Sequence, residues 1–109
     1  GSPIPISVHV DPEVKLSKDV AETAYFVANE AIANVLKHAK ARVGSVHVTK
    51  VGTTVRIVVH DDGVGGVDPS KGTGIAGIRA RVHAVDGTLT ITSPEGGPTT
   101  LSVEIPNRR

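Results

Sequence analysis

Polar side chains recur along one face of a predicted helix, at Glu30, Asn34, Lys37 and His38. Their positions, i, i+4, i+7 and i+8, place them on one stripe of an α-helix. The carboxamide of Asn34 offers a neutral oxygen of the kind that Mg²⁺ accepts beside phosphate oxygens and water. The ammonium of Lys37 is a point charge suited to phosphate. An ordinary solvated helix face would look the same, so a magnesium and phosphate surface is one of two interpretations.

An acidic, glycine-rich turn, Asp61–Gly66, follows a run of β-branched residues. Asp61 would present a fixed carboxylate acceptor at the end of a strand. The glycines would let a ligand approach the backbone closely. A plain turn is the alternative, whereas an EF-hand calcium loop is excluded because it needs alternating acids and a closing Glu.

A second glycine pattern, Gly72-x-Gly74-x-x-Gly77, opens another predicted helix. A dinucleotide fingerprint needs a strand joined directly to the loop and an acid about 20 residues further on. Here the polar loop Val67–Lys71 comes first, and Glu95 falls in a predicted turn. We therefore expect no dinucleotide site, although glycine amides at a helix start still form an anion site.

Composition excludes several classes of function. The chain of 109 residues suits one domain with one core, and 12 Lys and Arg against 11 Asp and Glu leave no basic field for nucleic acid. It has no cysteine, and its 5 histidines show no metal-ligand spacing. No apolar run approaches the roughly 20 residues of a membrane span. We expect a single domain over residues 1–109, with Gly1-Ser2 as a cloning scar on a fragment of a longer protein.

The predicted elements place these motifs on a sheet and two helices. Gly52-Thr53 is expected to form a hairpin turn, and Ser17 to cap the long helix. Alternation and helical spacing predict the order β-α-β-β-α-β-β, over Ile4–Val10, Lys18 to about Lys40, Val43–Val51, Thr54–Val59, Ile75 to about Val85, Thr88–Ser93 and Thr99–Ile105. Hairpins dominate this order, which predicts an α/β two-layer sandwich with a mixed sheet and both helices on one face.

The motifs, in this order, resemble those of the ATP-binding domain of sensor histidine kinases. Asn29–Ala39 is similar to the N box, Asp61–Gly65 to the first glycine box, D-x-G-x-G, and Gly72–Val82 to the second. The wider superfamily includes gyrase, a class of heat-shock chaperones and MutL. The residues of the first and third motifs most closely resemble those of the nitrate-sensor subfamily. The resemblance spans essentially the whole chain. It implies the Bergerat ATP-binding fold, with a five-stranded sheet.

The resemblance implies roles for residues at the base of a bound nucleotide. Asp61 would accept the adenine amino hydrogen, and Thr99 would join it through its hydroxyl or a water. Gly63 and Gly65 would let the base approach the backbone. Gly66 stands where the family often has Phe, and Pro98 where a Gly commonly precedes the threonine.

The resemblance also implies roles at the phosphates. Asn34 would bind Mg²⁺, and Glu30 would lie near the attacking group. The phosphates would be held by Lys37, His38, Gly72 and Gly74, with a capping role at the helix end as the alternative for His38. The loop Val67–Lys71 is shorter than the lid that histidine kinases usually carry there.

The function implied is binding of Mg·ATP and donation of its γ-phosphate to a histidine on a separate dimerisation domain. The expected partners are that domain and, indirectly, a response regulator. Nucleic acid and membrane contact are not expected, and the isolated domain is expected to be a cytoplasmic monomer. The alternatives are a hydrolysing ATPase with Glu30 as the base, an anti-sigma-type serine kinase, and a non-catalytic docking domain.

Overall fold

The computed structural model describes residues 4–38, 40–71 and 74–107. Along the chain they form β1 (Ile6–Val10), α1 (Lys18–His38), β2 (Gly44–Val51), β3 (Thr54–Asp61), α2 (Ile75–Ala84), β4 (Thr88–Thr92) and β5 (Thr99–Pro106). This confirms the predicted order of elements. One predicted boundary was wrong in a way that matters: β3 runs on to Asp61 instead of ending at Val59, so Asp61 belongs to the sheet and not to a loose turn.

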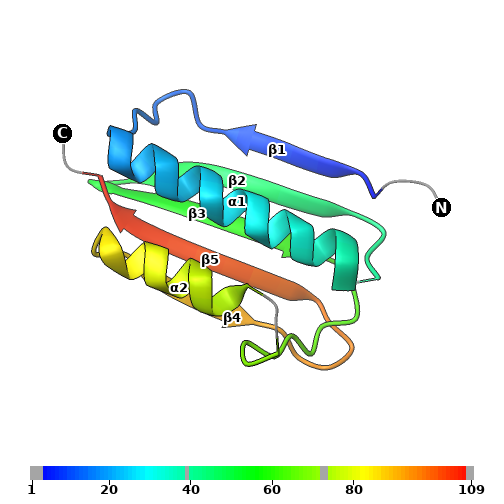
Figure 1. The fold of residues 1–109 in the computed structure, drawn as a ribbon. Helices are drawn as coiled ribbons and strands as arrows, with labels where there is room; N and C mark the ends of the chain where they lie inside the picture. Colours follow the sequence, from blue (N-terminus) through cyan, green and yellow to red (C-terminus); the bar gives the residue numbers. More distant parts are fainter. Residues whose placement is uncertain (1–3, 39, 72–73, 108–109) are drawn as a thin grey trace.

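The five strands form one mixed sheet in the order β1-β2-β3-β5-β4 (Figure 1). β1 is parallel to β2, and every other neighbouring pair is antiparallel. Gly52, with φ of 61°, and Thr53 form the predicted hairpin turn, because Val51 pairs with Thr54. The register of β3 against β5 places Asp61 opposite Thr99. Two predicted site residues, far apart in sequence, are thus side by side.

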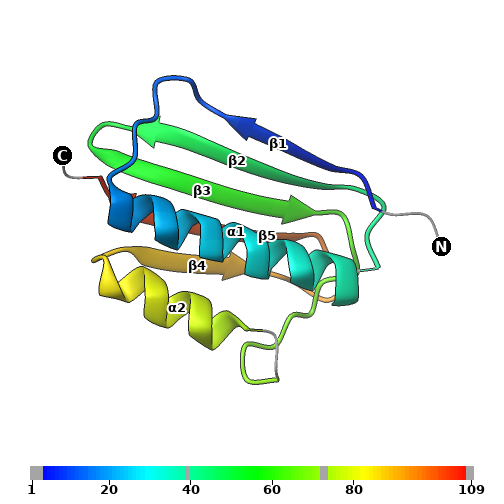
Figure 2. The ribbon, with the colours of Figure 1, turned by 45° about the horizontal axis from the view of Figure 1, so that its top comes forward.

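Both helices cover the same face of the sheet, as predicted (Figure 2). Strand β3 alternates strictly between half-buried and buried residues, which is the pattern of a strand with one covered face. Ser17 Oγ accepts the Val20 N–H at 3.4 Å, as expected of a helix cap. The core is aliphatic, and its most deeply buried side chains are Val27, Val55, Ile57, Ile75, Ile78, Val82, Val103 and Ile105.

The β1 edge of the sheet is less covered than its apolar alternation predicts. The strand begins at Ile6 and not at Ile4, and its Val8 and Val10 side chains are 64% and 53% exposed. The physical reason is the placement of the helices: α1 packs against β2 and β3, and α2 packs against β4. The core therefore lies between the two helices and the central strands of the sheet.

Candidate functional site

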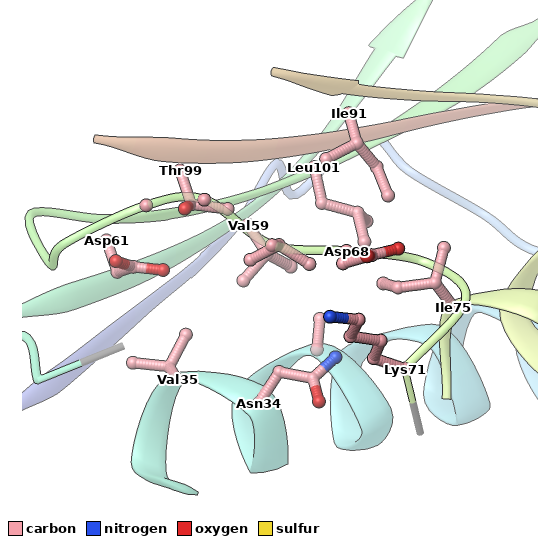
Figure 3. A pocket seen from close by; sticks show the side chains of 14 residues that line it. Asn34, Val35, Val59, Asp61, Asp68, Lys71, Ile75, Ile91, Thr99 and Leu101 are labelled. Atoms are coloured by element: carbon pink, nitrogen blue, oxygen red, sulfur yellow. The ribbon is translucent and has the colours of Figure 1, made fainter. Parts of the chain in front are cut away.

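A cavity of about 250 Å³ opens between α1, the last residues of β3, the first residues of β5 and the loop that leads to α2. Apolar side chains form much of its wall: Ala31, Val35, Val59, Val67, Ile75, Ile91 and Leu101. Its polar side chains lie in two groups (Figure 3). Asp61 and Thr99 occupy one end, and Asn34, Asp68 and Lys71 the other. An apolar slot with a few convergent polar groups is the usual form of a small-molecule site.

Asp61 is the most deeply buried charged residue of the site, at 3% exposure. Its Oδ1 accepts the backbone N–H of Gly63 at 2.8 Å, which fixes the carboxylate at the end of β3. Gly63 is itself buried. The side chain of Asp61 also lines the cavity. The carboxylate can therefore accept a hydrogen bond from a ligand donor without rearranging.

Thr99 lines the cavity beside Asp61, although Pro98 precedes it. Its hydroxyl oxygen lies 2.7 Å from that of Ser93, at the end of β4. Ser93 Oγ also accepts the backbone N–H of Val67 at 3.0 Å. The hydroxyl of Thr99 is thus held in place by a residue outside the predicted site.

The turn after Asp61 packs tightly against the turn between β4 and β5. The Gly96 N–H donates to the Val64 carbonyl at 2.8 Å, and the Gly66 N–H to the Ser93 carbonyl at 3.0 Å. A Cβ added to Gly65 would lie 1.9 Å from the Pro94 carbonyl oxygen, and one added to Gly97 would lie 1.9 Å from the Gly63 carbonyl oxygen. This backbone contact is a sufficient reason for glycine at position 65, in addition to any approach of a base.

The far end of the cavity carries charge. Asn34, half-buried on α1, and Lys71, in the loop before α2, both line it. The Asp68 carboxylate accepts hydrogen bonds from the Ser70 hydroxyl at 2.6 Å and the Ser70 N–H at 2.9 Å. These two bonds lower the pKa of Asp68, the hydroxyl contributing most. Asp68 therefore stays ionised at neutral pH.

Glu30 lies against the start of α2 and is not one of the cavity-lining side chains. Gly74 is the N-cap of α2, with φ of 75°, and a Cβ built there would lie 2.6 Å from Glu30 Oε2. The carboxylate thus faces the positive end of α2, where negative charge is stabilised. The predicted catalytic acid and the second glycine box are neighbours in space.

Three predicted phosphate-binding residues are not among the described residues that line the cavity. Lys37 is exposed, one turn beyond Asn34 on α1, and is not among the residues that line the cavity. Gly72 lies outside the described residues, and so does the side chain of His38 at the end of α1. Their predicted roles stay predictions.

Asp62 fastens the loop after α1 to the first glycine box. Its Oδ1 accepts the backbone N–H groups of Arg42 and Val43, at 2.8 and 3.0 Å. The bond from Val43 and then the bond from Arg42 lower the pKa of the exposed Asp62 carboxyl. One side chain therefore joins the segment that follows α1 to the turn at the end of β3.

Sequence reasoning missed Ser93 and the apolar wall. The wall could have been found, because Val59 and Leu101 stand two residues before Asp61 and two after Thr99, on the same faces of their strands. Ser93 had no such signal, since a serine before a proline reads as an ordinary turn residue.

Within the described ranges, no group of three or more His, Asp or Glu side chains is arranged to hold a metal ion. The same ranges contain no helix that is long and apolar enough to cross a membrane.

Comparison with known proteins identifies the family of the chain. Residues 19–109 match the family model described as "Histidine kinase-, DNA gyrase B-, and HSP90-like ATPase". The kinase/phosphatase UhpB of Salmonella typhimurium is 35% identical over 99 residues, which are 88% of this chain and 19% of that protein. The sensor histidine kinase DesK of Bacillus subtilis is 37% identical over 81 residues, 72% of this chain and 21% of that protein. The chain thus spans about a fifth of these relatives, which are of the nitrate-sensor type.

Solved structures share the fold. The blue-light activated histidine kinase of Erythrobacter litoralis superposes with a TM-score of 0.84 at 24% identity, covering 98% of this chain and 36% of that one. The catalytic domain of the histidine kinase ThkA gives a TM-score of 0.72 at 19% identity, covering 95% of this chain and 78% of that one. These likenesses confirm the Bergerat sandwich. The chain therefore belongs to this ATPase family, as a catalytic ATP-binding domain of the two-component sensor histidine kinase type.

Proposed function

We propose that the domain binds Mg·ATP in the cavity and donates its γ-phosphate to a histidine on a separate dimerisation domain. One observation carries the proposal: a buried, fixed carboxylate, Asp61, stands at one end of an apolar slot, and charged groups stand at the other. A slot of this form suits a ligand with a flat apolar base at one end and phosphates at the other. The base is proposed to lie at Asp61 and Thr99, and the phosphates toward Asn34 and the start of α2.

The residues at the phosphate end fit a hard divalent cation. Asn34 provides an amide oxygen, and Mg²⁺ prefers few protein oxygens together with phosphates and water. The lack of a cluster of three or more metal-binding side chains among the described residues agrees with a cation that arrives with the nucleotide. When bound, Mg²⁺ would neutralise phosphate charge, and Asn34 would hold it. The phosphates would also contact Lys37, His38, Gly72 and Gly74.

The chemistry proposed is direct transfer to nitrogen. The bond between the γ-phosphorus and the β–γ bridging oxygen breaks, a bond from the γ-phosphorus to the acceptor imidazole nitrogen forms, and ADP leaves. Glu30 would take the imidazole proton, because its carboxylate lies beside the start of α2, next to the proposed phosphate site. Most of the rate enhancement would come from positioning and charge neutralisation.

The partners follow from this reaction. The dimerisation domain of the same kinase would supply the histidine, and a response regulator would receive the phosphoryl group from it. The domain itself is proposed to be a monomer that works in the cytoplasm, where ATP is available, without contacting nucleic acid or membrane.

The test is transfer in trans. The chain and Mg·ATP are mixed with the separately prepared dimerisation and acceptor domain of a relative such as DesK, and phosphohistidine on the added domain is followed. Glu30→Gln should slow transfer while ATP binding holds, and Glu22→Gln, an exposed glutamate on the same helix, should change neither. Steady ATP hydrolysis without transfer would instead indicate a hydrolysing ATPase, and phosphoserine on a partner a serine kinase. Loss of ATP binding in Glu30→Gln would make Glu30 a structural residue.

A further inference from the structure

Ser93 lies at the centre of a small hydrogen-bond network at the end of the cavity where Asp61 and Thr99 lie. Its Oγ accepts the Val67 N–H at 3.0 Å and contacts Thr99 Oγ1 at 2.7 Å. Ser93 is half-buried, and it follows the last residue of β4. It joins three segments: the stretch after the first glycine box, the end of β4 and the start of β5.

The hydrogens of this network can be arranged in two ways, because either hydroxyl can be the donor. A hydroxyl carries one hydrogen and two lone pairs. If Thr99 donated to Ser93, the Ser93 hydrogen would need another acceptor, and the hydrogen bonds of the described residues provide none. If Ser93 donates to Thr99, its hydrogen is used and the Thr99 hydrogen remains. Only the second arrangement leaves the remaining hydrogen on a cavity-lining residue, Thr99, where a bound ligand or a water can accept it. Binding of a base with a ring-nitrogen acceptor would therefore favour the second arrangement.

We propose that Ser93 is a positioning residue for recognition of the base. By donating to Thr99 Oγ1, it turns the Thr99 hydroxyl into a donor aimed into the cavity, beside the Asp61 carboxylate, which is an acceptor. Figure 3 shows that Thr99 and Asp61 lie at the same end of the cavity. This inference rests on the proposed function, because it concerns the base of the same nucleotide.

A donor next to an acceptor selects a complementary edge. Adenine carries an amino donor at C6, and a ring-nitrogen acceptor lies on each side of it, at N1 and N7. The amino group would donate to Asp61, and one of the ring nitrogens would accept from Thr99, directly or through one water. Guanine carries an oxygen at C6, which would oppose the carboxylate of Asp61. Ser93 thus contributes to selectivity for adenine without touching the base.

The experiment measures the binding of ATP, 1-deaza-ATP and 7-deaza-ATP to the wild-type chain and to Ser93→Ala, Ser93→Thr and Ser102→Ala. Each analogue replaces one ring nitrogen by C–H. Wild type should bind one analogue roughly three- to tenfold more weakly than ATP, which is the range for loss of a neutral hydrogen bond. Ser93→Ala should abolish that difference, and Ser93→Thr, which keeps a hydroxyl, should restore it. Ser102→Ala, on the opposite face of the sheet, should behave as wild type.

Each outcome decides the proposal. A loss for Ser93→Ala that is equal for ATP and both analogues would mean that Ser93 only holds the loops together, and would overturn it. Equal affinity of wild type for all three nucleotides would also overturn it, whether or not the variant folds, while leaving ATP binding intact. Failure of wild type to bind ATP at all would overturn the proposed function itself.

Discussion

At the scale of the residue, the site depends on how the oxygens of Asp61 are used. Oδ1 is occupied by the Gly63 N–H, so the carboxylate cannot rotate freely. Because Asp61 lines the cavity, the lone pairs that the Gly63 N–H does not use can accept a hydrogen bond from a ligand there. A carboxylate fixed in this way accepts from a ligand at little entropic cost. The residue is therefore suited to recognition more than to proton transfer.

Asn34 can be tested separately from the base contact. Asn34→Ala removes the amide oxygen proposed to hold Mg²⁺, so affinity for Mg·ATP should fall roughly tenfold, or about 1.4 kcal/mol. Affinity for metal-free ADP should change little, as measured by calorimetric titration. Asn29→Ala is the matched control, because Asn29 is exposed on the same helix. Equal losses for both nucleotides, or an unfolded variant, would make Asn34 a structural residue.

At the scale of the element, the site is held together by contacts between loops. Gly65 and Gly52 have nearly the same φ, 64° and 61°, in the left-handed region. A Cβ at Gly52 meets nothing within 4 Å, whereas one at Gly65 meets the Pro94 carbonyl oxygen at 1.9 Å. Alanine substitutions at these two positions therefore separate the cost of backbone strain, which both share, from the cost of disturbed loop packing, which only Gly65→Ala has.

Gly52→Ala should cost about 1–2 kcal/mol of unfolding free energy, the strain of a left-handed alanine. Gly65→Ala should cost roughly 1–3 kcal/mol more, because the two turns must move apart. It should also weaken ATP binding, while Gly52→Ala should not. Chemical denaturation and nucleotide titration of both variants check this. Equal stability losses would show that the two turns separate easily.

The two hydrogen bonds that Asp62 accepts predict that the free energy of unfolding depends on pH. The folded state lowers the pKa of this carboxyl below the ordinary value of 3.8, because it accepts the Val43 and Arg42 N–H groups. The unfolded chain therefore takes up the proton first, and protonation favours unfolding. The stabilisation is present above the unfolded-state pKa and is lost as pH falls through the lower, folded-state value.

Denaturation of wild type and Asp62→Asn at several pH values between about 6 and 3 measures this. The variant should show a shallower decline in unfolding free energy on acidification, since it lacks the titrating group. If the unfolding free energies of the two proteins fell in parallel with pH, the charge of Asp62 would contribute nothing to stability. Asp68 shifts in the same direction and remains in both proteins, so it does not affect the comparison.

At the scale of the whole molecule, the element order and the helix-covered face were predictable because periodicity reports local burial. The alternation of β3 and the apolar face of α1 both appear in the structure as expected. The exposure of Val8 and Val10 was not predictable, because which strands the helices cover is decided by packing between distant elements. Alternation indicates which face of a strand is apolar, but not whether anything covers that face.

The site was predictable to a similar extent. Asp61, Asn34 and Thr99 were predicted as site residues from the motifs and the family resemblance, and all three line one cavity in the structure. The contacts of Ser93 and Asp62 were not predictable, because both depend on the register of β3 against its neighbours and on the path of two loops. Motifs predict the residues that line a cavity more readily than the neighbouring residues that hold those side chains in position.

The central claim is that Asp61 binds the base of a nucleotide, and calorimetric titration of wild type and Asp61→Asn with Mg·ATP and Mg·ADP tests it most directly. Asparagine can keep the Gly63 bond through its oxygen while its NH₂ opposes the adenine amino group. Both nucleotides should weaken together by about tenfold or more, since a hydrogen bond to a charged acceptor is worth roughly 1.5–3 kcal/mol. Asp86→Asn is the matched control, because it removes one carboxylate at an exposed position that does not line the cavity. This variant should bind both nucleotides as wild type does. Unchanged affinity in a folded Asp61→Asn would contradict the account.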